Sequence, residues 1–133
     1  MHTLPRLRMF DYFGIEAVSA IACSQFLFCF AFWTKKRFGF SDADNLLLYA
    51  VHGLAYIFSA KYGGKLADRM GHERWLALCL AGMTGVTLLG WLPAWTWRGA
   101  PFVVMALYTL SIGPLWPTLE TAILHSRGSI SMP

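Results

Sequence analysis

Four long apolar stretches, separated by short polar segments, make up most of this chain. They cover about residues 12–33, 45–62, 75–92 and 101–124. A helix needs about 20 apolar residues to cross the hydrocarbon core of a bilayer, and each stretch approaches that length. None shows the period-2 alternation of a membrane β-barrel strand. Because only helices and closed barrels satisfy their backbone groups in lipid, the pattern predicts an all-α polytopic membrane bundle with four transmembrane helices.

The polar segments contain recognisable helix boundaries. Ser41-Asp42-Ala43-Asp44 offers side-chain oxygens that can cap the second helix, and Pro101 suits the first turn of the fourth. We therefore expect residues 1–11 to form a cytoplasmic N-terminal segment and residues 12–125 to form the transmembrane part. Residues 126–133 would be a short truncated tail.

The composition agrees with a protein whose main partner is a lipid bilayer. Of the 133 residues, 56% are hydrophobic and 14% are charged, whereas a soluble domain has roughly a quarter charged residues. The formal net charge is +4, but the basic residues lie in short loops, where they orient a membrane protein. We therefore expect no binding of nucleic acid.

The distribution of Lys and Arg predicts the orientation. With the N-terminus inside, seven basic residues lie on the inner side and four on the outer side. The inner residues are Arg6, Arg8, Lys61, Lys65, Arg69, Arg74 and Arg127, and the outer ones are Lys35, Lys36, Arg37 and Arg98. Although the Lys35–Arg37 cluster argues the other way, the excess predicts a multi-pass inner-membrane protein with a cytoplasmic N-terminus.

The sequence gives no sign of catalytic or metal chemistry. Its three cysteines, Cys23, Cys29 and Cys79, all lie in apolar stretches without a CxxC spacing. No HExxH motif and no plausible Ser/His/Asp or Cys/His arrangement is present. We therefore expect no enzyme activity, no metal site and no cofactor.

The segment between the second and third stretches, Gly64-Lys65-Leu66-Ala67-Asp68-Arg69-Met70-Gly71, is the most informative part of the chain. Two glycines that permit positive φ angles predict a tight turn between antiparallel helices. Leu66 would pack into the helix ends, and Arg69 would pair with nearby carboxylates. Asp68, an anion at the membrane surface, would be stabilised by a helix N-terminus.

These residues resemble the signature loop of the major facilitator superfamily, which lies between the second and third helices on the cytoplasmic side. We assign to it Gly64, Leu66, Asp68, Arg69, Gly71 and Arg74. The resemblance implies that Asp68 docks on a helix of the second half of the molecule, which closes the inner gate and favours the outward-open form. The family usually has two basic residues after the last glycine, whereas His72-Glu73-Arg74 follows here.

The resemblance also implies a function. The chain would be the N-terminal part of a secondary transporter that moves an unknown small solute by alternating access, with H⁺ or Na⁺ as a possible coupling ion. Such transporters have about twelve helices in two related halves, and four are predicted here. We therefore expect a fragment that lacks its C-terminal half and is inactive alone.

Four polar side chains inside the apolar stretches are candidates for a cavity or for ion coupling. Glu16 and Glu120 lie at a similar depth, and the resemblance places the first and fourth helices around the substrate cavity. The pair could bind a cation or carry a proton; alternatively, each reaches water at the interface. Gln25 lies about half a turn out of phase with Glu16. Both Gln25 and Tyr108 either contact substrate or bond to a neighbouring helix.

The fourth stretch contains a predicted break at Gly113, Pro114 and Pro117, because each proline removes a helix hydrogen bond. The break is either a hinge for the transport cycle or a static bend. Small residues at every fourth position also predict close packing of the second helix on the third. They are Ala55, Ser59 and Gly63 on the second helix and Ala77, Ala81 and Gly85 on the third.

Two other functions remain open at this stage. If the chain is complete, its four helices and the carboxylate of Glu16 resemble the small multidrug resistance family of dimeric exporters. The Gly64–Gly71 segment and the fixed orientation argue against that reading. A membrane scaffold or assembly subunit without transport activity is the third possibility.

Overall fold

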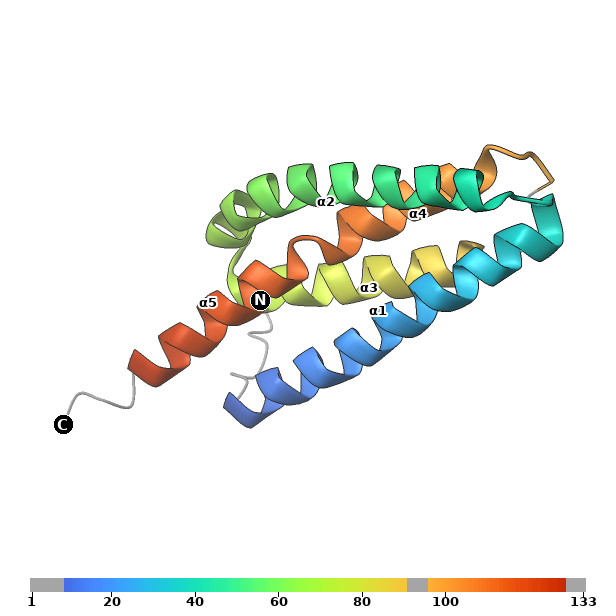
Figure 1. Ribbon diagram of the computed structural model, residues 1–133. Coiled ribbons are helices and arrows are strands. Elements are labelled where there is room, and N and C mark those ends of the chain that lie inside the picture. Colours follow the sequence, from blue (N-terminus) through green and yellow to red (C-terminus); the bar gives the residue numbers. More distant parts are fainter. Residues whose placement is uncertain (1–8, 91–95, 129–133) are drawn as a thin grey trace.

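The chain forms an antiparallel bundle of helices (Figure 1). The computed structural model describes residues 9–90 and 96–128, with side chains up to Leu124. Its helices are α1 (Met9–Phe38), α2 (Asp42–Met70), α3 (His72–Gly90), α4 (Ala100–Ile112) and α5 (Leu115–Gly128), and the described residues contain no strand. The predicted all-α bundle is therefore confirmed.

Successive helices run in opposite directions, and α4 and α5 together form one interrupted helix (Figure 1). The start of α1, the junction of α2 with α3 and the end of α5 share one end of the bundle. Residues 1–8, 91–95 and 129–133 lie outside the described residues. They include most of the expected N-terminal segment, the end of the third predicted stretch and most of the expected tail.

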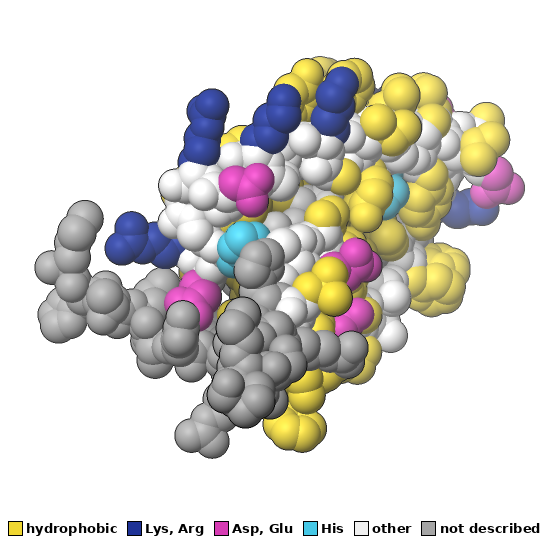
Figure 2. Space-filling view, turned by 90° about the vertical axis from the view of Figure 1, so that its left-hand side faces the viewer, with side chains coloured by type: hydrophobic (Ala, Val, Ile, Leu, Met, Phe, Trp, Pro, Cys, Tyr) yellow, Lys and Arg dark blue, Asp and Glu magenta, His cyan; other side chains and the backbone are white. Residues whose placement is uncertain are grey.

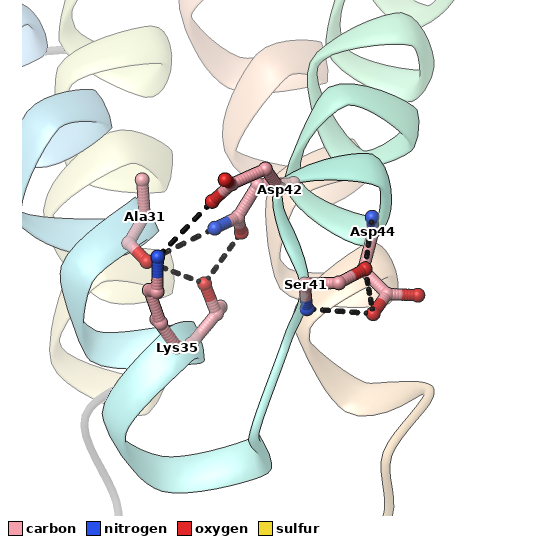
Figure 3. A network of polar contacts seen from close by, with 7 residues as sticks. Ala31, Lys35, Ser41, Asp42 and Asp44 are labelled. Atoms are coloured by element: carbon pink, nitrogen blue, oxygen red, sulfur yellow. Dashed lines mark hydrogen bonds and ion pairs between the residues drawn. The ribbon is translucent and has the colours of Figure 1, made fainter.

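The predicted cap of the second helix is confirmed in atomic detail (Figure 3). Ser41 is the N-cap of α2, where its hydroxyl accepts a hydrogen bond from the Asp44 amide at 3.1 Å. In return, the Ser41 amide donates to the Asp44 carboxylate at 2.8 Å, which completes a capping box. Lys35 at the end of α1 lies 3.1 Å from the Asp42 carboxylate. The capping box and this ion pair therefore both stabilise the short connection between α1 and α2.

The centre of the bundle is α4, which packs mainly against α2 and α3. A Cβ atom on Gly63 of α2 would overlap with Pro114, and one on Gly113 would overlap with Ser59. On the other side, a Cβ on Gly90 of α3 would lie 2.8 Å from Val104 Cγ1. These glycines let the helix backbones approach closely, as small residues do between membrane helices.

The predicted pairing of small-residue stripes on the second and third helices is therefore wrong. On α2, Ser59 and Gly63 face the break between α4 and α5. On α3, Ala77 and Ala81 are exposed, and a Cβ on Gly85 would meet nothing within 4 Å. The small residues of α2 do form a close helix contact, but their partners are α4 and α5 rather than α3.

Two apolar clusters fill the bundle along its length. One joins α1, α2 and α4 through Phe26, Phe30, Leu48, Val104, Met105, Tyr108 and Ile112. The other joins α1, α3 and α5 through Tyr12, Leu76, Cys79, Leu115, Leu119 and Ala122. The Phe26 and Tyr108 rings stack with their centroids 3.8 Å apart, so long aromatic side chains connect α1 to α4.

Two of the helices are long and apolar enough to cross a membrane by length and composition, within the described residues. They are Met9–Phe38 and the interrupted helix Ala100–Leu124. The other two contain more polar groups, since α2 includes His52 and Ser59 and the first turn of α3 includes Glu73 and Arg74. Many large apolar side chains are exposed on the outer surface, which suits contact with lipid.

Candidate functional site

The segment from Gly64 to Met70 is helical and forms the last two turns of α2. The predicted loop over these residues is therefore wrong, because only Gly71 leaves the helix. Gly71 has φ +88°, and its amide donates to the Ala67 carbonyl at 2.9 Å. Residues 65–70 have ordinary helix propensities, and a single glycine suffices to reverse the chain.

The side chains of this segment divide between the bundle and its surface. Ala67 is buried, whereas Leu66 is 41% exposed, so the prediction that Leu66 packs into the helix ends is wrong. Asp68 and Arg69 are exposed, and neither takes part in an ion pair within the described part of the chain. The predicted pairing of Arg69 with nearby carboxylates is therefore not present there.

The position of Asp68 is electrostatically unfavourable within its own helix. It lies in the last turn of α2, where the helix dipole is negative and favours cations. Arg69 in the same turn has the favourable sign for that end, whereas Arg74 lies in the first turn of α3, where the dipole of its own helix is positive. Figure 2 looks onto this end and shows basic side chains projecting from its rim. The carboxylate of Asp68 is thus open to a partner outside the described residues.

A cleft of about 200 Å³ lies between α1, α3 and α4. It is lined by Ala22, Phe26, Met83, Thr84, Thr87, Leu88 and Tyr108. The Thr84 hydroxyl donates to the Leu80 carbonyl at 2.9 Å and the Thr87 hydroxyl to Met83 at 2.8 Å, so their oxygens can still accept hydrogen bonds. No lining residue is charged, which gives the cleft an apolar wall with a few hydroxyl groups.

The four predicted cavity residues do not come together here. Tyr108 lines the cleft and is buried, whereas Gln25 is exposed on α1. Glu16 is half-buried on α1 and Glu120 is exposed on α5, and neither lines the cleft. Sequence reasoning missed the two threonines of α3, although hydroxyl groups in an apolar stretch were a visible signal.

The predicted break in the fourth helix is confirmed as a structural feature, since α4 ends at Ile112 and α5 begins at Leu115. Gly113 and Pro114 are buried against α2, and Pro117 lies half-buried within α5. The Ser59 hydroxyl lies 3.0 Å from the Tyr56 carbonyl and 3.4 Å from that of Thr109. Whether the break moves during transport stays a prediction.

A polar contact joins α2 to α4 about one turn before the break. His52 Nδ1 lies 2.7 Å from the Thr109 hydroxyl oxygen, and that hydroxyl lies 2.7 Å from the Met105 carbonyl. A hydroxyl has one proton, and a carbonyl can only accept. The Thr109 hydroxyl therefore donates to Met105, and His52 donates its Nδ1–H to Thr109.

The opposite end of the bundle contains an ion pair that the sequence did not reveal. Arg98, just before α4, lies 3.2 Å from the Asp44 carboxylate and 5.7 Å from the centroid of the Phe40 ring. Hydrogen bonds from the Ser41 amide and hydroxyl, with Arg98 beside them, hold the pKa of Asp44 below its ordinary value of 3.8. This pair connects the two turns at that end.

Comparison with known proteins gives one match. A family model described as Major Facilitator Superfamily matches residues 4–130, which is nearly the whole chain and includes the segment that ends at Gly71. No curated protein and no solved structure matches the chain.

Proposed function

Since this chain belongs to the major facilitator superfamily, we propose that it forms the N-terminal part of a secondary transporter. In such proteins two halves rock about a central site and open it to each side of the membrane in turn. The family match supports a membrane transporter of the major facilitator type. We propose further that it moves a small solute, with H⁺ or Na⁺ as the coupling ion, and that it needs a second half.

The observation that carries this proposal is the exposed carboxylate of Asp68 at the end of α2. Its own helix disfavours a negative charge there by about 0.3–1 kcal/mol. The N-terminus of a helix from the second half would reverse that cost, because its free amides and positive dipole favour an anion. Asp68 would therefore act as a latch that holds the two halves together at this end.

The cleft beside Tyr108 is the candidate for part of the solute path. It is lined by residues from α1, α3 and α4, and its threonine oxygens offer a few hydrogen-bonding groups in an apolar wall. Glu16, half-buried on α1, is the best placed of the two candidate carboxylates to bind the coupling ion. Glu120 is exposed and has ready access to water.

The test compares Asp68→Asn with Asp42→Asn in the full transporter. Asp42 is an exposed carboxylate at the other end of α2, and its ion pair within the described residues is with the exposed Lys35, so it is a matched control. Membrane vesicles are incubated with a cell metabolite extract, and mass spectrometry identifies the solutes that accumulate. Protein amount in the membrane is measured for each variant.

We expect the Asp68→Asn variant to insert normally and to accumulate solute roughly two- to fivefold more slowly, as the loss of about 0.3–1 kcal/mol at a helix terminus implies. The control should transport at the wild-type rate. The 133-residue chain alone should accumulate nothing. Equal rates for both variants would count against the latch, and accumulation by the chain alone would show that no second half is needed.

A further inference from the structure

Three cations form a line along the last turns of α2. Lys61, Lys65 and Arg69 are four residues apart, so they share one face of the helix. All three are exposed, and none takes part in an ion pair within the described residues. Lys61 makes a cation–π contact with its neighbour Tyr62, because its Nζ lies 5.7 Å from the centroid of that ring. We call these three residues the basic stripe.

The same outer face of α2 is apolar in the turns that precede Lys61. Leu54 is 60% exposed, Ile57 64% and Phe58 58%, and they lie in the two turns before the basic stripe begins. Tyr62, at the change, is half-exposed, and Tyr is enriched where a helix leaves the hydrocarbon core. The surface thus changes from apolar to cationic within about one turn, which marks the level of the membrane surface on this helix.

We propose that the basic stripe binds the headgroup of an anionic phospholipid whose acyl chains lie along Leu54, Ile57 and Phe58. The stripe is about 12 Å long at 1.5 Å per residue, which exceeds the thickness of one headgroup layer of roughly 5–8 Å. Lys61 and Lys65 lie at the level of the phosphate, and the long side chain of Arg69 reaches back toward it. A single lipid molecule meets both parts of this surface.

The choice of a lipid over a free phosphate follows from the continuity of the two surfaces. A free anion would use only the cations, and exposed lysines do not form an enclosed pocket for one. A phospholipid also covers the exposed apolar side chains next to them. Asp68 lies beside Lys65 on the helix without pairing to it, so the proposed latch and the basic stripe use different side chains.

The test uses the whole chain, purified in micelles of a non-ionic detergent. Phosphatidylglycerol or phosphatidylcholine with the same acyl chains is titrated in, and the temperature of unfolding and the number of bound lipids by native mass spectrometry are measured. The stripe variant is Lys61→Gln/Lys65→Gln/Arg69→Gln. The control variant, Lys35→Gln/Lys36→Gln/Arg37→Gln, also removes three positive charges. These three residues are consecutive in α1, so they do not share one face of the helix.

We expect phosphatidylglycerol to raise the unfolding temperature of the wild type and the control variant, and phosphatidylcholine to have little effect. Each basic residue near an anionic lipid surface contributes about fivefold in affinity, so the stripe variant should bind phosphatidylglycerol roughly a hundredfold more weakly. If the triple variant does not fold, Lys65→Gln alone should lose about fivefold, and Lys65→Arg should retain binding.

Three results would overturn the proposal. The first is equal binding of phosphatidylglycerol by the wild type and the stripe variant, or by the wild type and Lys65→Gln. The second is an equal loss in the control variant, which would show a response to total charge. The third is an equal shift on adding glycerol 3-phosphate or inorganic phosphate, which would show that the acyl chains contribute nothing.

Discussion

The two neighbouring glycines of α2 should respond in opposite ways to the same substitution. A Cβ on Gly63 would overlap with Pro114 Cβ and would lie 2.7 Å from its Cγ and 3.1 Å from its Cα. A proline ring and its backbone cannot rotate away. A Cβ on Gly64 would meet nothing within 4 Å, although it is next in sequence and in the same helix.

The size of the effect follows from these contacts. Carbon atoms pack at about 3.5–4.0 Å, so Gly63→Ala forces α2 away from Pro114 by about 1 Å. Overpacking of this kind costs about 1–3 kcal/mol. Both variants gain up to about 1 kcal/mol of helix propensity on replacing Gly by Ala. Gly64→Ala should therefore be neutral or stabilising, and Gly63→Ala should be less stable than Gly64→Ala by about 1–3 kcal/mol.

The measurement is the free energy of unfolding of each purified variant in mixed micelles, obtained by titration with a denaturing detergent. The wild type and the two variants are compared at one protein concentration. The shared gain in propensity cancels between the variants, so their difference reports the contact with Pro114. Equal free energies of unfolding for Gly63→Ala and Gly64→Ala would refute the close approach of α2 to the break.

Two further predictions concern the two ends of the bundle. Because the pKa of Asp44 is held below 3.8 in the folded protein, its stabilising contribution is present above that pH and is lost as the pH falls through the folded pKa. The unfolding temperature of the wild type should decrease as the pH is lowered below 3.8. The Asp44→Asn variant should be less stable at neutral pH and should lack this part of the pH dependence. Identical pH profiles for the two proteins would contradict the assignment. With the native cysteines replaced by serine, Arg69→Cys should react with a membrane-impermeant maleimide only after the cells are opened, and Lys36→Cys should react in intact cells, as the excess of inner Lys and Arg predicts. The reverse pattern of labelling would contradict a cytoplasmic N-terminus.

Features determined locally could be predicted from the sequence. The apolar stretches predicted the helices, and the side-chain oxygens of the Ser41–Asp44 segment predicted a cap, because capping depends only on residues within one turn. The proline-containing break in the fourth stretch was predicted for the same reason.

Features determined by the position of another helix could not be predicted. The small residues Ser59 and Gly63 indicated a close contact, but the sequence did not say that α4 and α5 would provide it. The ion pair of Arg98 with Asp44 joins residues 54 positions apart, and no local pattern indicates it. The error at Gly64 had a different origin, since two glycines looked equivalent and only Gly71 adopts a positive φ.

The central place of α4 has a consequence for how the protein is made. The ribosome completes α1, α2 and α3 before it reaches Ala100, so the glycine recesses at Gly63 and Gly90 are first open to lipid. The nascent hairpin of α2 and α3 must then admit the fourth span between its arms. Any residue that closes that gap early would block assembly during biosynthesis, even where it leaves the separate helices intact.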